Sequence, residues 1–403
     1  MDAAIEQSFE EEVAFLKQLI GIRSENPPGD NDQAAEQIAK LITELGFEVE
    51  AYPVPEPFVR QHGMTSITNL IVRQKFGDGN GPTIALNSYA DVVGAGEGWS
   101  SNPFEAKISD DKIFGRGAVI AKSDIASYLF ALKALKKCSD HLQGQVELHV
   151  TFDGEMGGHV GPKWLLEQGL STPDYAITTG FSYEVVRAHN GCLHLEVICR
   201  GRQAHAAKPE LGCDALEGAH YVLSALYKER KRLLSISSET EGIAGPRLTV
   251  GVIEGGIHTN VVPERVAIKI DRRLTPEEAG EDEEEALVAL IEKSVPVELG
   301  VEVECRRLML AEPLRVTPAQ DTLTNLLYSK ARSCFGESVT IQGAPLFTDA
   351  RHYAEAGVPT VVYGAGPETL AESGAHGIDE HLRMNDLKGA SWVVATALYD
   401  LLK

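Results

Sequence analysis

Hydrophobic positions near the start of the chain recur every three to four residues, which predicts amphipathic helices. The stripe of the first helix consists of Phe9, Val13, Leu16 and Ile20. Ser8 and Glu11 have the spacing of a capping box, so this helix is expected to begin near Ser8. The stripe of a second helix consists of Ala34, Ile38, Leu41 and Leu45. Gly46 follows it and is expected to end it.

Short apolar runs then alternate with helical stretches. Buried strands are expected at "TIALNSY", "VELHVTF", "DYAITTG" and, near the end of the chain, "PTVVYG". Helices are expected in "DIASYLFALKALKK", over 318–334 and from about Met384 onward. Strands separated by helices predict an α/β fold, in which a mostly parallel sheet carries helices on both faces.

The pattern changes at residue 188. Strands are expected at "CLHLEVICRG", "PRLTVGVIEGG" and "VVPERVAIKIDRR", with helices around 214–233 and 276–293. The predicted architecture is therefore an α/β domain over residues 1–187 and 308–403, interrupted by an inserted α+β domain over 188–307. The acidic run "EEAGEDEEEA" is interpreted as a solvated helix face.

Composition narrows the class of partner and the compartment. The 403 residues carry a formal net charge of −22, which argues against nucleic acid and against an anionic membrane as partners. No apolar run approaches the roughly 18 residues of a membrane span, and the first residues carry acids where a secretory signal carries basic residues. The six cysteines show no C-x-x-C spacing, as expected for free thiols in the cytoplasm.

Candidate chemistry follows the predicted strands, because open parallel sheets bind ligands at the carboxyl ends of their strands. The segments at these ends include Tyr89 with Asp91, "GRGAVIAKSD", "TFDGEMGG" and "TTGFS". With "GWSSNPFEAKISDDKIFGRGA", "GRQAHAAKPELGCDAL", "GGIHTNVVPERV" and "AHGIDEHLRMNDL", they make nearly the whole chain resemble the di-zinc aminoacylase and carboxypeptidase family. That family includes acetylornithine deacetylase, succinyl-diaminopimelate desuccinylase and carboxypeptidase G.

The resemblance implies two zinc ions bridged by an aspartate, with a glutamate base, but this sequence departs from that pattern. The first ligand position holds Tyr89, two residues before Asp91, and the bridging position holds Ile120. The base position holds Gly154, and the next acidic ligand falls on Gly180 or Phe181. Only Glu155 and His376 remain at ligand positions. Because zinc usually requires three protein ligands, we expect no cofactor, or at most one weakly held divalent ion such as zinc.

Three residues match the substrate-binding part of the family. His205 matches a histidine that reaches into the partner subunit's site and polarises the scissile carbonyl. Asn260 and Arg351 match residues that hold a substrate carboxylate. Alternatives stay open: His205 as a surface residue, Arg351 as an ion-pair residue, Asn260 as a turn former, and Glu155 with His376 as relics joined by a hydrogen bond. The family also implies that the α/β domain is the catalytic-type domain and that the inserted domain is a lid or dimerisation domain, which builds a homodimer.

Three hypotheses of function follow. The first is an enzyme that binds a small carboxylate-bearing amide-type substrate without the two-zinc centre. In it, Glu155, Asp91, Tyr89 or His376 transfers protons. The second is a catalytically inactive relative with a binding or regulatory role. The third is an amide hydrolase with one metal held by Glu155, His376 and a further residue such as Asp91 or Asp153. The sequence leaves the substrate, and the choice between hydrolysis, condensation and isomerisation, undecided.

Overall fold

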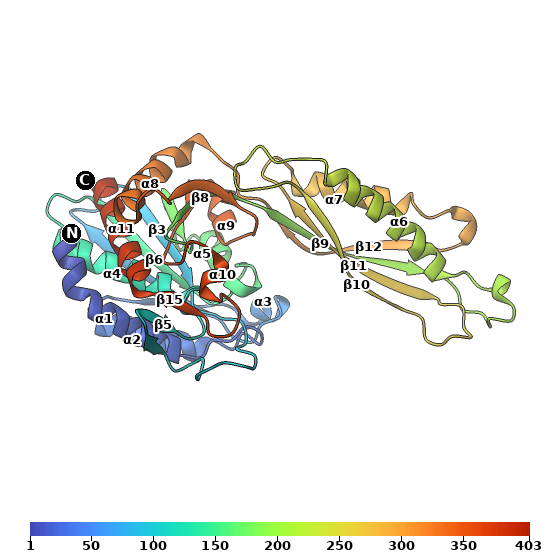
Figure 1. Ribbon diagram of the computed structural model, residues 1–403, viewed down its shortest axis with the longest axis horizontal. Helices are drawn as coiled ribbons and strands as arrows, with labels where there is room; N and C mark the ends of the chain where they lie inside the picture. Colours follow the sequence, from blue (N-terminus) through green and yellow to red (C-terminus); the bar gives the residue numbers. More distant parts are fainter. The chain divides into compact units, whose positions relative to one another are not determined.

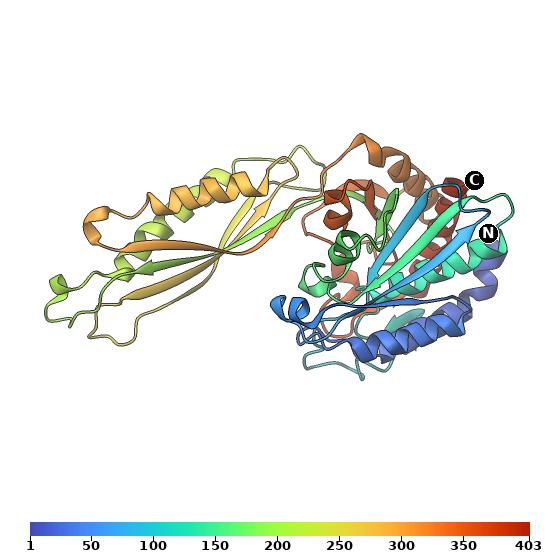
Figure 2. The ribbon, with the colours of Figure 1, turned by 180° about the vertical axis from the view of Figure 1, so that it is seen from behind.

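The computed structural model describes residues 1–403, apart from the side chain of Leu370. The chain divides into two compact units, each drawn in Figure 1 and, from behind, in Figure 2. Unit 1 comprises Met1–Arg187, Thr317–Ile341 and Thr348–Lys403. Unit 2 comprises Ala188–Val316 and Gln342–Phe347. Their expected roles, catalytic-type and lid or dimerisation, stay predictions.

The large sheet has eight strands in the order β1-β2-β6-β3-β7-β14-β8-β13. Their bounds are β1 Glu50–Pro53, β2 Thr68–Phe76, β3 Thr83–Tyr89, β6 Gly144–Thr151, β7 Tyr175–Thr178, β8 Glu184–His189, β13 Thr340–Ala344 and β14 Thr360–Val362. The four central strands, β6, β3, β7 and β14, are parallel. Antiparallel strands β1, β2 and β8 flank them. The expected mostly parallel α/β sheet is confirmed, and its central strands all end at one edge.

Helices cover both faces of this sheet. The longer ones are α1 Asp2–Gly21, α2 Asp32–Glu44, α4 Lys122–Lys137, α8 Asp321–Phe335 and α11 Met384–Leu402. Helix α4 is buried along most of its length between α1, α11 and the sheet. The short helices are α3 Glu56–Gln61, α5 Pro162–Glu167, α9 Ala350–Glu355 and α10 Leu370–Ser373. Helix α9 packs on β7 and β14 beside α5, where Tyr353 joins a small apolar cluster. A three-stranded sheet of β4 Lys107–Ser109, β5 Lys112–Phe114 and β15 His381–Arg383 completes unit 1.

The start of α1 differs from the expectation. The helix begins at Asp2, and Ser8 lies inside it, where its hydroxyl donates to the carbonyl of Ala4 at 2.9 Å. The predicted capping box is therefore wrong. The reason is that Ile5, which is 2% exposed, extends the apolar stripe one turn towards the N-terminus. A serine in mid-helix can bond the carbonyl four residues before it without ending the helix.

Unit 2 is a four-stranded antiparallel sheet covered on one face by two helices. The strands are β9 Gly191–Arg200, β10 Arg247–Gly255, β11 Arg265–Leu274 and β12 Glu302–Ala311, in the order β10-β11-β9-β12. The helices are α6 Ala215–Leu233 and α7 Gly280–Glu292. Alternate residues of β9, from Leu193 to Cys199, join the core beneath these helices, and so do Val266, Ile268 and Ile270 of β11. Residues between them therefore face the other side of the sheet.

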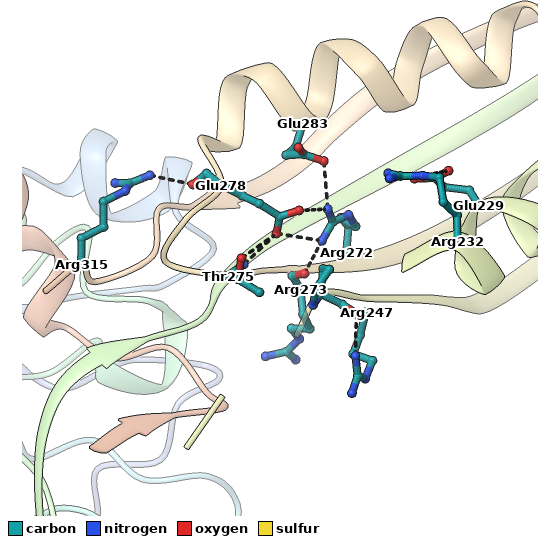
Figure 3. A network of polar contacts seen from close by, with 10 residues as sticks. Glu229, Arg232, Arg247, Arg272, Arg273, Thr275, Glu278, Glu283 and Arg315 are labelled. Atoms are coloured by element: carbon teal, nitrogen blue, oxygen red, sulfur yellow. Dashed lines mark hydrogen bonds and ion pairs between the residues drawn. The ribbon is translucent and has the colours of Figure 1, made fainter. Parts of the chain in front are cut away.

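The acidic segment 277–286 is not simply a solvated helix face. Glu278 and Glu283 bind the guanidinium of Arg272, whose side chain is only 3% exposed (Figure 3). Glu281 and Glu284 both bind Arg307 on β12. The acids therefore join α7 to the sheet by ion pairs. In the described residues, no helix has the length and apolar character that a membrane crossing requires.

Candidate active site

The candidate residues gather where the central parallel strands end. Tyr89 is the last residue of β3, and Thr151 of β6 pairs with it. The segment after β6 forms a short 3-10 helix, η1 Gly154–Met156, which carries Glu155. Gly180 follows β7, and 364–366 follows β14. This is the edge of the sheet at which the candidate residues were predicted to lie, since open parallel sheets bind ligands at the carboxyl ends of their strands.

Asp91 is fully buried and holds the turn that carries Glu155. Its two carboxylate oxygens accept hydrogen bonds from the backbone N–H groups of Gly154 and Glu155 at 3.0 and 3.1 Å. The side-chain amide of Asn26 donates a third, at 3.1 Å. Burial, with smaller contributions from the charges of Glu155 and Asp153, raises the pKa of Asp91 well above its usual value. Asp91 therefore positions Glu155.

Glu155 and His376 form a pair across 221 residues of sequence. The Nε2 atom of His376 lies 3.1 Å from Oε1 of Glu155. The hydrogen bond to Glu155 raises the pKa of His376 above 6.5, against the opposing effect of burial. The imidazole is 47% exposed and the Glu155 side chain 9%. His376 also has a left-handed backbone, with φ of 58°, which is uncommon for a non-glycine residue and is found at functional sites.

Tyr89 lies against the backbone of Gly154. A Cβ atom on Gly154 would stand 2.2 Å from Cγ and 2.3 Å from Cδ1 of the Tyr89 ring. No side chain fits at position 154 while the ring keeps this place. Burial, followed by the charges of Glu155 and Asp349, raises the pKa of the Tyr89 phenol well above 10. The phenol therefore stays protonated at neutral pH and can donate a hydrogen bond.

A second aromatic ring, that of Phe181, lies at one of the two positions where the family resemblance places the next acidic ligand. Phe181 lies so close to Gly366 that a Cβ there would stand 2.1 Å from its ring. Nearby, the buried carboxylate of Asp124 accepts from the N–H groups of Ala365 at 2.6 Å and Gly180 at 3.1 Å. Asp124 lies in the first turn of α4, where a local sequence pattern suggests only a capping role. Its real partners come from two distant loops, which a local pattern does not reveal.

Arg351 lies beside the turn that follows Glu155, which includes Gly157. It is 2% exposed, and Nη2 donates to the carbonyl of Gly157 at 2.5 Å. The ring of His352 makes a second hydrogen bond to this carbonyl, at 2.8 Å. Burial and the charge of Asp153 raise the pKa of the neighbouring Asp349 to about 7, although the cation of Arg351 lowers it. Arg351 thus supports the segment after Glu155 and offsets buried acids.

The loop of His376 is held by an ion pair that the sequence did not single out. Arg116 donates to Glu380 at 2.7 Å, and both side chains are at most 2% exposed. The other oxygen of Glu380 accepts from the N–H groups of Val119 and Ile120 at 3.0 and 3.3 Å. Arg116 also donates to the carbonyl of His376 at 3.4 Å. The loop "GRGAVI" and the loop of His376 are therefore one connected structure.

The donor set here does not fit a two-metal centre. Ile120 and Phe181 carry hydrocarbon side chains, Gly154 and Gly180 carry none, and the Tyr89 phenol resists deprotonation. Within the described part of the chain, no third histidine, cysteine, aspartate or glutamate brings a ligand atom to Glu155 and His376 in a metal-binding cluster. Two ligands fall short of the three that usually hold a catalytic zinc ion.

His205 and Asn260 lie together in unit 2. His205 pairs with Val261 in an isolated β-bridge, and the N–H of Ala206 donates to the carbonyl of Asn260 at 2.9 Å. The imidazole is exposed, and its Nδ1 accepts from the N–H of Ala207 at 3.0 Å. An open pocket of about 470 Å³ adjoins the imidazole of His205. The lining residues are Gln203, Ala204, His205, Ala207, Lys208 and Leu211.

Known proteins resemble this chain over its whole length. Residues 85–400 match the sequence model of Peptidase family M20/M25/M40. An N-formyl-4-amino-5-aminomethyl-2-methylpyrimidine deformylase from Halalkalibacterium halodurans is 24% identical over 99% of this chain and 96% of its own. Aminoacylase-1 from Sus scrofa is 27% identical over 92% of this chain and 90% of its own. The aminopeptidase PepT structure from Bacillus cereus superposes with a TM-score of 0.76 at 22% identity, over 98% and 99% of the chains.

Proposed function

The chain belongs to peptidase family M20/M25/M40, a family of hydrolases of amide and peptide bonds, and we propose that it acts on a small carboxylate-bearing amide without the two-zinc centre. Proton transfer in this proposal falls to Glu155 and His376. The observation that carries it is their hydrogen bond of 3.1 Å, since it couples an acid and a base at the edge where ligands bind.

The pair suits the proton balance of amide hydrolysis. Water loses a proton as it attacks the carbonyl carbon, and the leaving nitrogen gains a proton as the C–N bond breaks. The Glu155 carboxylate accepts the first proton, and the protonated imidazole of His376 donates the second. The carboxylate of Glu155 raises the pKa of His376, which keeps the imidazole protonated over a wider pH range. Asp91 and Tyr89 position the pair and the carbonyl.

The substrate-binding residues extend this proposal. His205 is proposed to polarise the substrate's carbonyl from the partner subunit, and its exposed imidazole is available for such a contact. Asn260 and Arg351 are proposed to bind the carboxylate. Because Arg351 is buried against Gly157, the carboxylate must reach the guanidinium beside that turn.

We also propose a homodimer formed by unit 2. Strand β10 is an edge strand, and its Val252 and Ile253 are 39% and 50% exposed. On α6, Leu216 and Tyr227 are 53% and 47% exposed and lie within about 20° of each other around the helix axis. Pairing of β10 with its copy, with α6 beside α6, would cover these side chains. Tyr227→Lys is expected to shift the sedimentation coefficient at micromolar concentration to that of a monomer. A wild-type monomer would contradict the dimer.

A binding or regulatory role is the second candidate. The observation that favours it is the Tyr89 ring on Gly154, which closes the position where the family's base would stand. In that case the chain binds the substrate class without turning it over.

The test is turnover of N-acyl amino acids and dipeptides, with chelator and with added zinc, manganese or cobalt. The proposal expects turnover that survives chelation and falls by about 100-fold or more in Glu155→Gln and in His376→Ala, the loss typical of removed acid–base groups. Glu167→Gln is the matched control, since Glu167 lies on the surface of α5 with 56% exposure. Chelator-sensitive turnover at a temperature where the chelated chain stays folded, or turnover unchanged in Glu155→Gln, would refute the proposal. Saturable binding without turnover would favour the second candidate.

A further inference from the structure

A cluster of three potential metal ligands lies in unit 2, apart from the residues assigned above. Cys192 and His194 are two residues apart on β9, and Asp271 is the direct cross-strand partner of His194 on β11. Because side chains alternate along a strand, all three point to the face of the sheet opposite α6 and α7. Backbone pairing of two central strands thus brings the three side chains together.

Their ligand atoms converge on one point. Nε2 of His194 lies 3.2 Å from Sγ of Cys192 and 2.8 Å from Oδ2 of Asp271, and Sγ and Oδ2 are 3.5 Å apart. In a tetrahedral zinc site, with zinc–sulfur bonds near 2.3 Å and zinc–nitrogen and zinc–oxygen bonds near 2.0 Å, ligand atoms stand roughly 3.3–3.6 Å apart. Small side-chain rotations bring the observed triangle to that size.

The contacts differ from those of a hydrogen-bonded nucleophile triad. In such a triad the histidine uses its two ring nitrogens for two different partners. Here the same nitrogen, Nε2 of His194, faces both the thiol and the carboxylate. The thiol of Cys192 itself donates to Oδ2 of Asp271, so that this oxygen faces both the thiol and Nε2 of His194, whereas one cation at the centre of the triangle can bind all three atoms.

Partial exposure of the cluster on one side leaves room for a fourth ligand. Cys192 is fully buried, while the side chains of His194 and Asp271 are 37% and 28% exposed. Water can therefore complete a tetrahedron from the exposed side. Arg273 donates from Nε to both oxygens of Asp271, at 3.0 and 3.2 Å, and so fixes the orientation of this carboxylate.

We propose that Cys192, His194 and Asp271 bind one zinc ion. Thiolate, imidazole and carboxylate together are a zinc-type donor set. On binding, the thiol of Cys192 releases its proton to solvent, and the thiolate and carboxylate balance the charge of Zn²⁺. The ion links β9 to β11 and stabilises unit 2. This site is independent of Glu155 and His376 and of the proposed reaction.

Cobalt reports the site directly. The full-length chain, kept reduced with a non-chelating phosphine, is titrated with Co²⁺ and then with Zn²⁺. A thiolate-to-cobalt charge-transfer band and the strong visible bands of tetrahedral cobalt should appear at one ion per chain, and zinc should remove them. Cys192→Ser and the more exposed His194→Ala should each weaken cobalt binding by about 100-fold or more, because even outer-shell changes typically cost 10–100-fold.

Two controls locate the ion. Cys199→Ser changes an equally buried thiol on β9 that faces the helices, and it should leave the cobalt spectrum unchanged. The double variant Glu155→Gln/His376→Ala should also keep it. The assignment is overturned if saturating cobalt gives no sulfur band, if the band persists in both Cys192→Ser and His194→Ala, or if the double variant loses it.

Discussion

The contact between Tyr89 and Gly154 makes a strong prediction about packing. Gly154→Ala adds one Cβ, which would stand 2.2 Å from Cγ of the ring, and Cγ is the ring atom nearest the backbone. The ring cannot swing its far end away, so side chain or backbone must shift. Overpacking of this kind typically costs about 1–3 kcal/mol. Gly154 has no left-handed backbone, so the cost is steric.

A double-mutant cycle isolates that cost. In the Tyr89→Ala background the space at position 154 is open, so Gly154→Ala should change the free energy of unfolding by less than about 0.5 kcal/mol. The coupling between the two positions is then about 1–3 kcal/mol. Gly21→Ala is the control, because its new Cβ would meet only the carbonyl oxygen of Phe104, at 3.8 Å.

Scanning calorimetry measures this effect, with the transition of unit 1 followed separately from that of unit 2. Each kcal/mol lost from the free energy of unfolding should lower the Tm by roughly 2–4 °C for a domain of about this size. Equal Tm values for Gly154→Ala and Gly21→Ala, or an equal cost with and without the Tyr89 ring, would refute the reasoning. The same geometry predicts that a glutamate at position 154 is accommodated only when Tyr89 is also replaced.

Three further predictions concern charged groups. Glu155→Gln should lower the pKa of His376 towards 6.5, because it removes the carboxylate that raises this pKa. The variant should also lose the stabilisation from protonated His376, which wild type has in full below pH 6.5 and loses as the pH rises through the raised pKa. NMR titration of the imidazole tests this, and an unchanged pKa would contradict it. Asp349→Asn should abolish the loss of stability that wild type suffers as the pH rises from about 4 to 7, because folding raises the pKa of the Asp349 carboxyl from 3.8 to about 7 and ionisation at neutral pH is then unfavourable. Melts of the two proteins should therefore converge at acidic pH and separate at neutral pH, and equal pH dependence would contradict this. Arg272→Ala should destabilise unit 2 by about 3–5 kcal/mol, because it leaves Glu278 and Glu283 partly buried and unpaired. Arg232→Ala, which breaks an exposed pair with Glu229 (Figure 3), should cost less than about 1 kcal/mol, and similar losses in the two variants would refute the distinction.

Local patterns predicted the elements whose periodicity is strong. Strand β3 has the bounds of "TIALNSY", and α2 ends as expected before Gly46, whose φ is +84°. Strand β2 was missed because its second half, "RQKF", is mostly polar and reads as a surface segment. Strand β12 was missed for a similar reason, because its charged residues hide the alternation of apolar positions. In the fold these charges are satisfied by neighbours, as in the ion pair of Arg307 with Glu284. Tertiary pairing decides both strands.

The site was only partly readable from the sequence. Parallel topology placed Tyr89 and Glu155 at one edge, and the resemblance added His376. Asp91 and Asp124 bind backbone N–H groups 63 and 241 residues away in the sequence, and the fit of Tyr89 on Gly154 also depends on a distant segment, so local patterns do not reveal these contacts. The Cys192 cluster has no sequence motif, because cross-strand register brings Asp271 to β9.

Unit 2 is assembled from two stretches of chain, and this limits how it can be isolated. The short segment Gln342–Phe347 belongs to it: the N–H of Asn190 donates to the carbonyl of Ala344, and the N–H of Gly343 donates to the carbonyl of Glu241. A fragment cut at residues 188 and 316 would leave the N–H of Asn190 and the carbonyl of Glu241 without these partners. Any attempt to produce the inserted part by itself must therefore carry 342–347 along, joined by a linker or supplied as a separate peptide.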